Sequence, residues 1–121
     1  MADAYVLPLE TLRMTDVASV GGKNASLGEL ISQLSAAGVR VPGGFATTAQ
    51  AFIDFLAASD LKPRIDAALA KLDVENMGAL ARTGAEIREW VAAAPFQPEL
   101  ERQVRDAYAR LAGSGEESFA V

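Results

Sequence analysis

The residues with the clearest chemical potential are Gly21-Gly22-Lys23, which stand just before an expected helix. Glycine carries no Cβ, so a ligand can approach the backbone closely there. The start of the following helix offers unpaired N–H groups and the positive end of its dipole. Lys23 adds a mobile charge suited to a phosphate, and before residue 62 the only other basic side chains are Arg13 and Arg40. The segment therefore predicts an anion site.

The same residues have a plainer interpretation as a simple connection between two elements. They do not form a Walker A loop, because the four-residue spacer and the second glycine before the lysine are missing. On physical grounds alone, the plain connection is the more frequent outcome of such a pattern. The anion site therefore stays a hypothesis at this point.

Four other segments have a functional and a structural interpretation, and the structural one is favoured for each. Pro42-Gly43-Gly44-Phe45 fits a binding lip or a tight turn. Trp90 and Phe96 suit base stacking or a helix core. Glu116-Glu117 fits either a pair of metal ligands or two acidic side chains exposed to solvent in a loop. The fourth is a charged helix face made by Arg102, Arg105 and Asp106.

Composition excludes several classes of function. The 121 residues suit one compact domain or one lobe of a larger one, and half are hydrophobic. The net charge of −5, from 11 basic and 16 acidic residues, shows no basic face, so nucleic acid is not an expected partner. The sequence has no cysteine and no histidine, which excludes disulfide bonds, thiolate metal ligands and catalysis by an imidazole group. We therefore expect no catalytic residue and no metal ligand in this chain.

The N-terminus and the hydropathy pattern predict a cytoplasmic location. Residues 1–4 (Met-Ala-Asp-Ala) lack the basic and apolar regions of a secretory signal. No apolar run approaches the ~20 residues that a membrane span needs. We expect no membrane as a partner.

The elements around the glycines are expected to be a strand and a helix. Residues 5–9 suit an edge strand, because Pro8 cannot donate to a ladder. A helix should begin within two residues of Ala25 and include residues 26–37, with Ser26 and Glu29 as a capping box and Asn24 as a competing cap. Its apolar face contains Leu27, Leu30, Ile31 and Leu34, and Gly38 should end it.

The rest of the chain predicts two short strands and four more helices. Residues 39–41 and Phe45-Ala46 suit strand, on either side of the glycine turn. Thr47, with Gln50, should cap a helix that begins within two residues of Thr48. Apolar stripes predict further helices over residues 61–72, 80–91 and 98–111, followed by a loop at residues 113–115. Residues 118–121 suit the start of a strand, so we expect a fragment of a longer protein.

These motifs resemble the opening of the phosphoenolpyruvate synthases. The resemblance rests on residues 14–16 (Met-Thr-Asp), 20–29 (Val-Gly-Gly-Lys-Asn-Ala-Ser-Leu-Gly-Glu) and 39–48 (Val-Arg-Val-Pro-Gly-Gly-Phe-Ala-Thr-Thr). Pyruvate, phosphate dikinases and rifampicin phosphotransferases have similar openings, commonly with a Pro-Pro-Gly-Phe turn, and the Pro-Gly-Gly form seen here favours the synthases. A non-catalytic helical interaction module remains the rival from another class.

The resemblance implies a fold and a function. It implies that residues 1–121 are the N-terminal, helix-dominated α/β portion of an ATP-grasp-like domain with a few short strands. Lys23 matches the family lysine that contacts the ATP phosphates, and Gly21 and Gly22 match its glycines. The family converts pyruvate, ATP and water to phosphoenolpyruvate, AMP and phosphate through a phosphohistidine, with magnesium. The histidine domain, the second ATP-grasp lobe with its magnesium ligands and the pyruvate barrel are expected outside this chain, so the isolated chain should be inactive.

Overall fold

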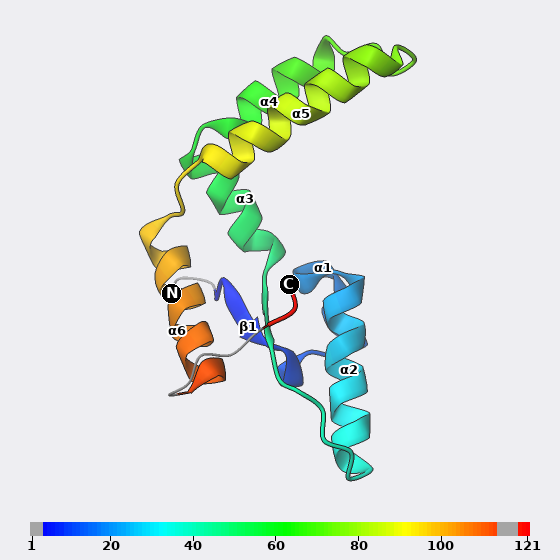
Figure 1. Ribbon diagram of the computed structural model, residues 1–121, viewed down its shortest axis with the longest axis vertical. Coiled ribbons are helices and arrows are strands. Elements are labelled where there is room, and N and C mark those ends of the chain that lie inside the picture. The colour runs from blue at the N-terminus through cyan, green and yellow to red at the C-terminus, as the bar shows by residue number, and fades with distance from the viewer. Residues whose placement is uncertain (1–3, 114–118) are drawn as a thin grey trace. The chain divides into compact units, whose positions relative to one another are not determined.

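The computed structural model describes residues 4–113 and 119–121. The chain forms two compact units, one made of Met1–Phe52 with Pro98–Val121 and the other of Ile53–Gln97. Helices dominate, and the described residues contain a two-stranded sheet (Figure 1). This confirms the expected mixture of many helices with short strands.

The sheet of the first unit pairs two distant segments. Strand β1 (Val6–Pro8) runs antiparallel to β2 (Phe45–Thr47), with Leu7 opposite Ala46. Both are edge strands, which is why Pro8 is tolerated without an N–H. The pairing is extended on one side by a hydrogen bond from the Leu9 N–H to the Gly44 carbonyl, at 2.9 Å. The strands expected at residues 5–9 and at Phe45-Ala46 are confirmed.

Four helical segments follow β1. Two short 3-10 helices, η1 (Leu9–Thr11) and η2 (Met14–Asp16), lead into α1 (Val17–Val20) and then into α2 (Gly22–Ala36). Gly38 has a φ of +82°, and the Val39 N–H donates to the Leu34 carbonyl at 2.9 Å. Such a left-handed glycine closes the last turn of a helix, so the predicted end of α2 is confirmed.

The strand expected at residues 39–41 is wrong. These residues have no regular secondary structure, and the N–H of Val39 is used to close α2. Residues 42–44 therefore lead into β2 and do not join two strands. The cap of the next helix, α3 (Ala49–Ala58), is also corrected. Thr47 lies in β2, and Thr48 caps the helix by accepting from the Ala51 N–H at 3.1 Å.

The first unit is completed by α6 (Pro98–Ala112). The helix begins at Pro98, as expected for a proline in a first turn. The ring of Phe119 meets that of Tyr108 edge-on, with centroids 5.2 Å apart. Residues 119–121 are not a strand, however, and Val121 is fully exposed, so that expectation is wrong for the described residues. The two described strands pair with each other. Residues 114–118 lie outside the described part of the chain.

The second unit contains a helical hairpin. Helices α4 (Leu61–Ala70) and α5 (Met77–Ala93) run side by side in opposite directions (Figure 1). The Asn76 side chain caps α5 by accepting from the Ala79 N–H at 3.0 Å. Both helices appear where apolar periodicity predicts them. In the described part of the chain, no helix is long and apolar enough to cross a membrane.

Candidate functional site

The predicted anion site lies at a sharp turn between α1 and α2. Gly21 has φ +85° and ψ 162°, a conformation that L-residues rarely adopt. Its N–H donates to the Val17 carbonyl at 2.8 Å, and its own carbonyl accepts from the Ala25 N–H at 3.1 Å. Gly21 therefore ends one helix and begins the next.

Helix α2 begins at Gly22, three residues before Ala25, so the predicted start within two residues of Ala25 is wrong. The N-cap is Gly21, which supplies no side-chain cap. The first N–H groups of a helix have no partner within the helix. At this turn they are free of a side-chain cap and available to an anion.

The side chains expected to cap the helix have other partners. Ser26 lies inside α2, and its hydroxyl donates to the Met14 sulfur at 3.5 Å. The Glu29 carboxylate accepts from the Met14 N–H at 3.1 Å, and the Asn24 Nδ2 donates to the Val20 carbonyl at 2.9 Å. The predicted capping box is therefore wrong, because Gly21 starts the helix one turn earlier than Ser26 would.

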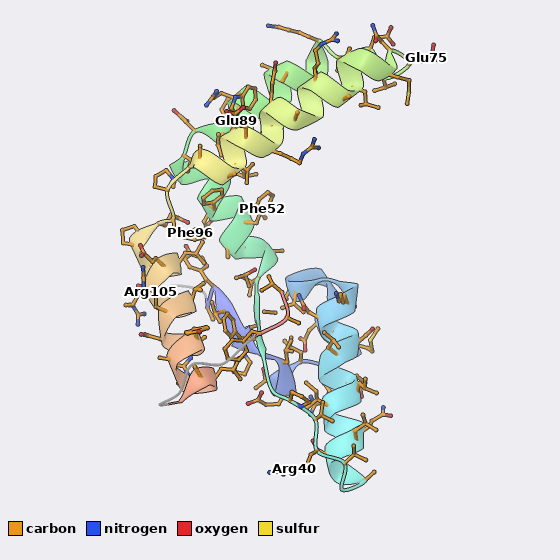
Figure 2. The ribbon with its side chains drawn as sticks, viewed as in Figure 1. Arg40, Phe52, Glu75, Glu89, Phe96 and Arg105 are labelled. Atoms are coloured by element: carbon orange, nitrogen blue, oxygen red, sulfur yellow. The ribbon has the colours of Figure 1, made fainter. Side chains whose placement is uncertain are left out.

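Lys23 is exposed in the first turn of α2. Within the described chain it forms no ion pair. Arg13 directs its guanidinium to the carbonyls of Glu10 and Leu12, at 2.9 and 2.7 Å. Arg40 lies beyond the other end of α2 (Figure 2), a helix of roughly 22 Å. Lys23 is thus a cation at the glycine turn that is committed to no acidic partner.

The turn rests on the core of the first unit. Ala25 is completely buried and packs with Leu12, Val20 and Ala46. Val20 is the last residue of α1, and Ala46 lies in β2. Residues directly before and after the glycines are therefore anchored to the sheet, while Gly21, Gly22 and Lys23 face solvent.

Space around both glycines is open. A Cβ built on Gly21 or Gly22 would meet nothing within 4 Å. In the described part of the chain, no side chain therefore covers this face of the turn at the two glycines. Uncapped helix N–H groups and a nearby ammonium are groups of the kind that hold an anionic oxygen by hydrogen bonds and charge.

Two of the other candidate segments line cavities. Gly43, Gly44 and Phe45 line a cavity of about 240 Å³ with Arg110, next to β1. Trp90 carries the guanidinium of Arg64 on its face, 4.3 Å from the ring centroid, and lines a groove of about 480 Å³ between α4 and α5.

The remaining candidates are an aromatic residue, a charged helix face and a pair of acidic residues. The ring of Phe96 pairs with that of Phe55, at 6.1 Å between centroids. Arg102 and Arg105 bridge acidic residues on α6, which supports the charged-face interpretation. Glu116 and Glu117 lie outside the described residues. Within residues 4–113 and 119–121, no three acidic side chains gather as a metal site would require.

Sequence reasoning missed the contacts that hold the turn. The bonds from Met14 to Glu29 and from Asn24 to Val20 have no periodicity that would reveal them. One signal was available: residues 14–16 are one of the segments on which the family resemblance rests. Their presence indicates that the segment ahead of the turn has a specific structure.

The sequence of the chain matches a family of known proteins. Residues 17–121 match the family described as "Pyruvate phosphate dikinase, AMP/ATP-binding domain". The chain is 57% identical over 124 residues to the phosphoenolpyruvate synthase of Neisseria meningitidis, covering 100% of this chain and 16% of that protein. It is 54% identical over 117 residues to the phosphoenolpyruvate synthase of Escherichia coli, covering 96% of this chain and 15% of that protein. The chain thus spans about a sixth of the length of these relatives.

Proposed function

The chain belongs to the pyruvate phosphate dikinase AMP/ATP-binding domain family, and from this premise we propose that Gly21, Gly22 and Lys23 form one wall of an ATP site. The observation that carries the proposal is the exposed Lys23 in the first turn of α2, beside helix N–H groups that no side chain caps. The resemblance identifies this lysine with the one that contacts the ATP phosphates. Both arguments lead to the same three residues.

The physical role of these residues is to bind and orient phosphate. The helix start supplies N–H donors and a partial positive charge. The ammonium of Lys23 adds a full charge, and charge-assisted hydrogen bonds are about twice as strong as neutral ones. Magnesium, when bound, neutralises phosphate charge during transfer, and its ligands are expected outside this chain. Lys23 therefore positions the phosphates and stabilises their charge.

The activity that we propose for the whole protein is that of a phosphoenolpyruvate synthase. Relatives 57% and 54% identical to this chain carry that name. By the family resemblance, ATP, pyruvate and water give phosphoenolpyruvate, AMP and phosphate through a phosphohistidine. The chain has no histidine, so that residue must come from another domain. Residues 1–121 would form the N-terminal portion of an ATP-grasp-like domain, beside the second lobe, the histidine domain and the pyruvate barrel.

Three expectations stay predictions: the inactivity of the isolated chain, the cytoplasmic location, and the use of water as second acceptor. The relatives' names favour the synthase over the phosphate-dependent dikinase.

Replacing Lys23 by alanine tests the ATP site. In the full-length enzyme, Lys23→Ala should remove a charge-assisted contact and weaken ATP-dependent AMP formation by about 10- to 150-fold. The melting temperature should stay unchanged, because exposed substitutions usually alter stability by about 0.5 kcal/mol or less. AMP release and thermal unfolding are measured on the same preparation.

Arg40→Ala is the matched control, since it removes an exposed cation from the other end of α2. It should leave AMP formation unchanged. Normal AMP formation by Lys23→Ala would refute the role of this lysine. An equal loss in both variants would indicate that net charge, not the site, is responsible.

A further inference from the structure

The side chain of Glu29 joins the middle of α2 to the backbone that leads into the glycine turn. Its Oε2 accepts from the N–H of Met14 at 3.1 Å, fifteen residues away in the sequence. Met14 is the first residue of η2, which continues directly into α1 and Gly21. We call residues 12–21 the lead-in segment.

The lead-in segment is attached to α2 at both of its ends. At its start, α2 approaches so closely that a Cβ on Gly28 would lie 2.5 Å from the Leu12 carbonyl oxygen. The Glu29 bond to Met14 lies beside this contact. At its end, the Asn24 side chain donates to the Val20 carbonyl at 2.9 Å. Between these attachments the segment forms a closed loop on the helix.

Gly21 is the flexible point between these attachments. Its backbone is the junction between the lead-in segment and α2, and a Cβ built there would meet no described atom within 4 Å outside residues 20–22. Glycine also has the widest choice of backbone torsions. The direction of α1 relative to the first turn of α2 is therefore set by contacts on either side of Gly21. These are the packing of Val20 and Ala25 in the core and the attachments along the lead-in segment.

We propose that Glu29 is a positioning residue for the ATP site, acting through Met14 and the lead-in segment to fix Lys23 and the free N–H groups relative to bound phosphate. The inference rests on the proposed function of Lys23. Glu29 itself lies seven residues beyond Gly22, about two turns into α2, so it is not part of the phosphate wall. Small displacements of binding groups are costly, since a shift of about 1 Å can cost ~100-fold in rate.

The exposure of Met14 allows a positioning role for Glu29 to be distinguished from a role in stability alone. Met14 is 50% exposed, so water can satisfy its N–H when the carboxylate is removed. Loss of the bond should therefore cost little stability. It should instead loosen the lead-in segment at Met14, while the Leu12 contact and the Asn24 bond remain.

A double-mutant cycle on the full-length enzyme tests the proposal, with ATP affinity measured by titration calorimetry. Glu29→Ala should weaken ATP binding ~10-fold. This is the lower end of the roughly 10- to 100-fold loss that follows when a residue supporting a metal ligand is removed, and we use it as the scale for a supporting residue here. Glu29→Gln keeps an acceptor oxygen and should bind ATP within about twofold of the wild type. In a Lys23→Ala background, Glu29→Ala should change the affinity by less than about twofold, because residues that act as a unit are not additive.

Glu89→Ala is the matched control, since it removes an exposed helical carboxylate from α5 (Figure 2). It should leave ATP affinity and melting temperature unchanged. Thermal unfolding of every variant accompanies the titration, and Glu29→Ala should melt like the wild type.

The outcomes separate this inference from the proposed function. If Lys23→Ala weakens ATP binding but Glu29→Ala does not, the positioning role is wrong and the ATP site stands. If the losses from the two substitutions multiply, or if Glu29→Gln loses as much as Glu29→Ala, Glu29 does not act through this bond and the inference fails. If Lys23→Ala binds ATP normally, the proposed site and the inference both fail.

Discussion

Adjacent glycines at the turn have different physical roles. Gly21 has a φ of +85°, whereas Gly22 is the first helical residue of α2 and has an ordinary backbone. With a ψ of 162° as well, Gly21 lies in a region that essentially only glycine occupies, and this region costs an L-residue about 1–3 kcal/mol. The need for glycine at position 21 is therefore a matter of backbone conformation. At position 22, the role that we propose for glycine is to leave the first N–H groups of α2 uncovered by a side chain.

The two alanine substitutions at these glycines form a matched pair. Neither new methyl group would meet an atom within 4 Å beyond its own local backbone, so clash with the rest of the described chain contributes to neither. Gly21→Ala should lose about 1–3 kcal/mol through the strained backbone torsions. Gly22→Ala should be neutral or more stable by up to about 1 kcal/mol, because alanine favours helix. Urea unfolding of both variants measures the difference, and equal midpoints would show that Gly21 does not require its positive φ.

Sequence reasoning proposed the chemical groups of the candidate site but not how they are held. Lys23 and its glycines were predicted from their types and order, and the structure places them together at a helix start. The torsion of Gly21 leaves no mark on composition or periodicity. Glu29 was misassigned because its spacing from Ser26 fits a capping box, while its real partner, Met14, is distant in sequence.

At the scale of elements, α2 packs through two small residues and Ile31. Apolar periodicity predicted a face of Leu27, Leu30, Ile31 and Leu34. Of these, Ile31 is buried, whereas Leu27 and Leu30 are exposed, at 36% and 50%. The other buried positions are Ala25 and Gly28. The backbone of the lead-in segment approaches Gly28 so closely that a side chain does not fit there. Alanine and glycine give a weak hydrophobic signal, so sequence alone did not reveal this part of the face.

Close packing at Gly28 predicts a large effect for a single methyl group. A Cβ there would lie 2.5 Å from the Leu12 oxygen and 2.6 Å from the Leu9 oxygen, so backbone must move. Overpacking of this kind costs about 1–3 kcal/mol. Gly28→Ala should therefore lower the melting temperature and also the ATP affinity, because the lead-in segment is displaced.

Gly84→Ala is the control for Gly28→Ala. Gly84 lies within α5, and its new methyl would meet only the end of the flexible Arg88 side chain, at 3.2 Å. It should be neutral or more stable by up to about 1 kcal/mol. Differential scanning fluorimetry compares the two. A Gly28→Ala protein that melts like the wild type would contradict the backbone contact.

At the scale of the whole molecule, the first unit is assembled from the two ends of the chain. Residues 1–52 and 98–121 form one compact body, and residues 53–97 form another. The Gln103 side chain of α6 joins the ends: its Oε1 accepts from the N–H groups of Tyr5 and Val6, at 2.7 and 3.2 Å. Helix periodicity predicted α6 itself. It could not predict this bond, which spans 98 residues of sequence.

Glu99 makes this junction sensitive to acid. Its carboxylate accepts from the Arg102 guanidinium and from the Gln103 Nε2, the latter at 2.9 Å. These hydrogen bonds, that from Arg102 first, lower the pKa of Glu99 from its usual 4.5 to about 2. A carboxyl group whose pKa is lowered by folding stabilises the folded state above its unfolded pKa. The contribution is therefore complete above about pH 4.5 and declines progressively toward pH 2.

The acid response should appear at the start of β1. When this junction opens, Glu99 regains its ordinary pKa and takes up a proton at pH 3, whereas in the closed junction it stays mostly ionised. Opening of the contact between Gln103 and the Tyr5 and Val6 amides therefore becomes easier in acid. In the full-length enzyme, hydrogen exchange of a peptide covering residues 4–8, corrected for the intrinsic rate, should show less protection at pH 3 than at pH 6. Glu99→Gln has a neutral acceptor at every pH, so its protection should start lower and change less. An identical decline in both proteins would show that another group controls the junction.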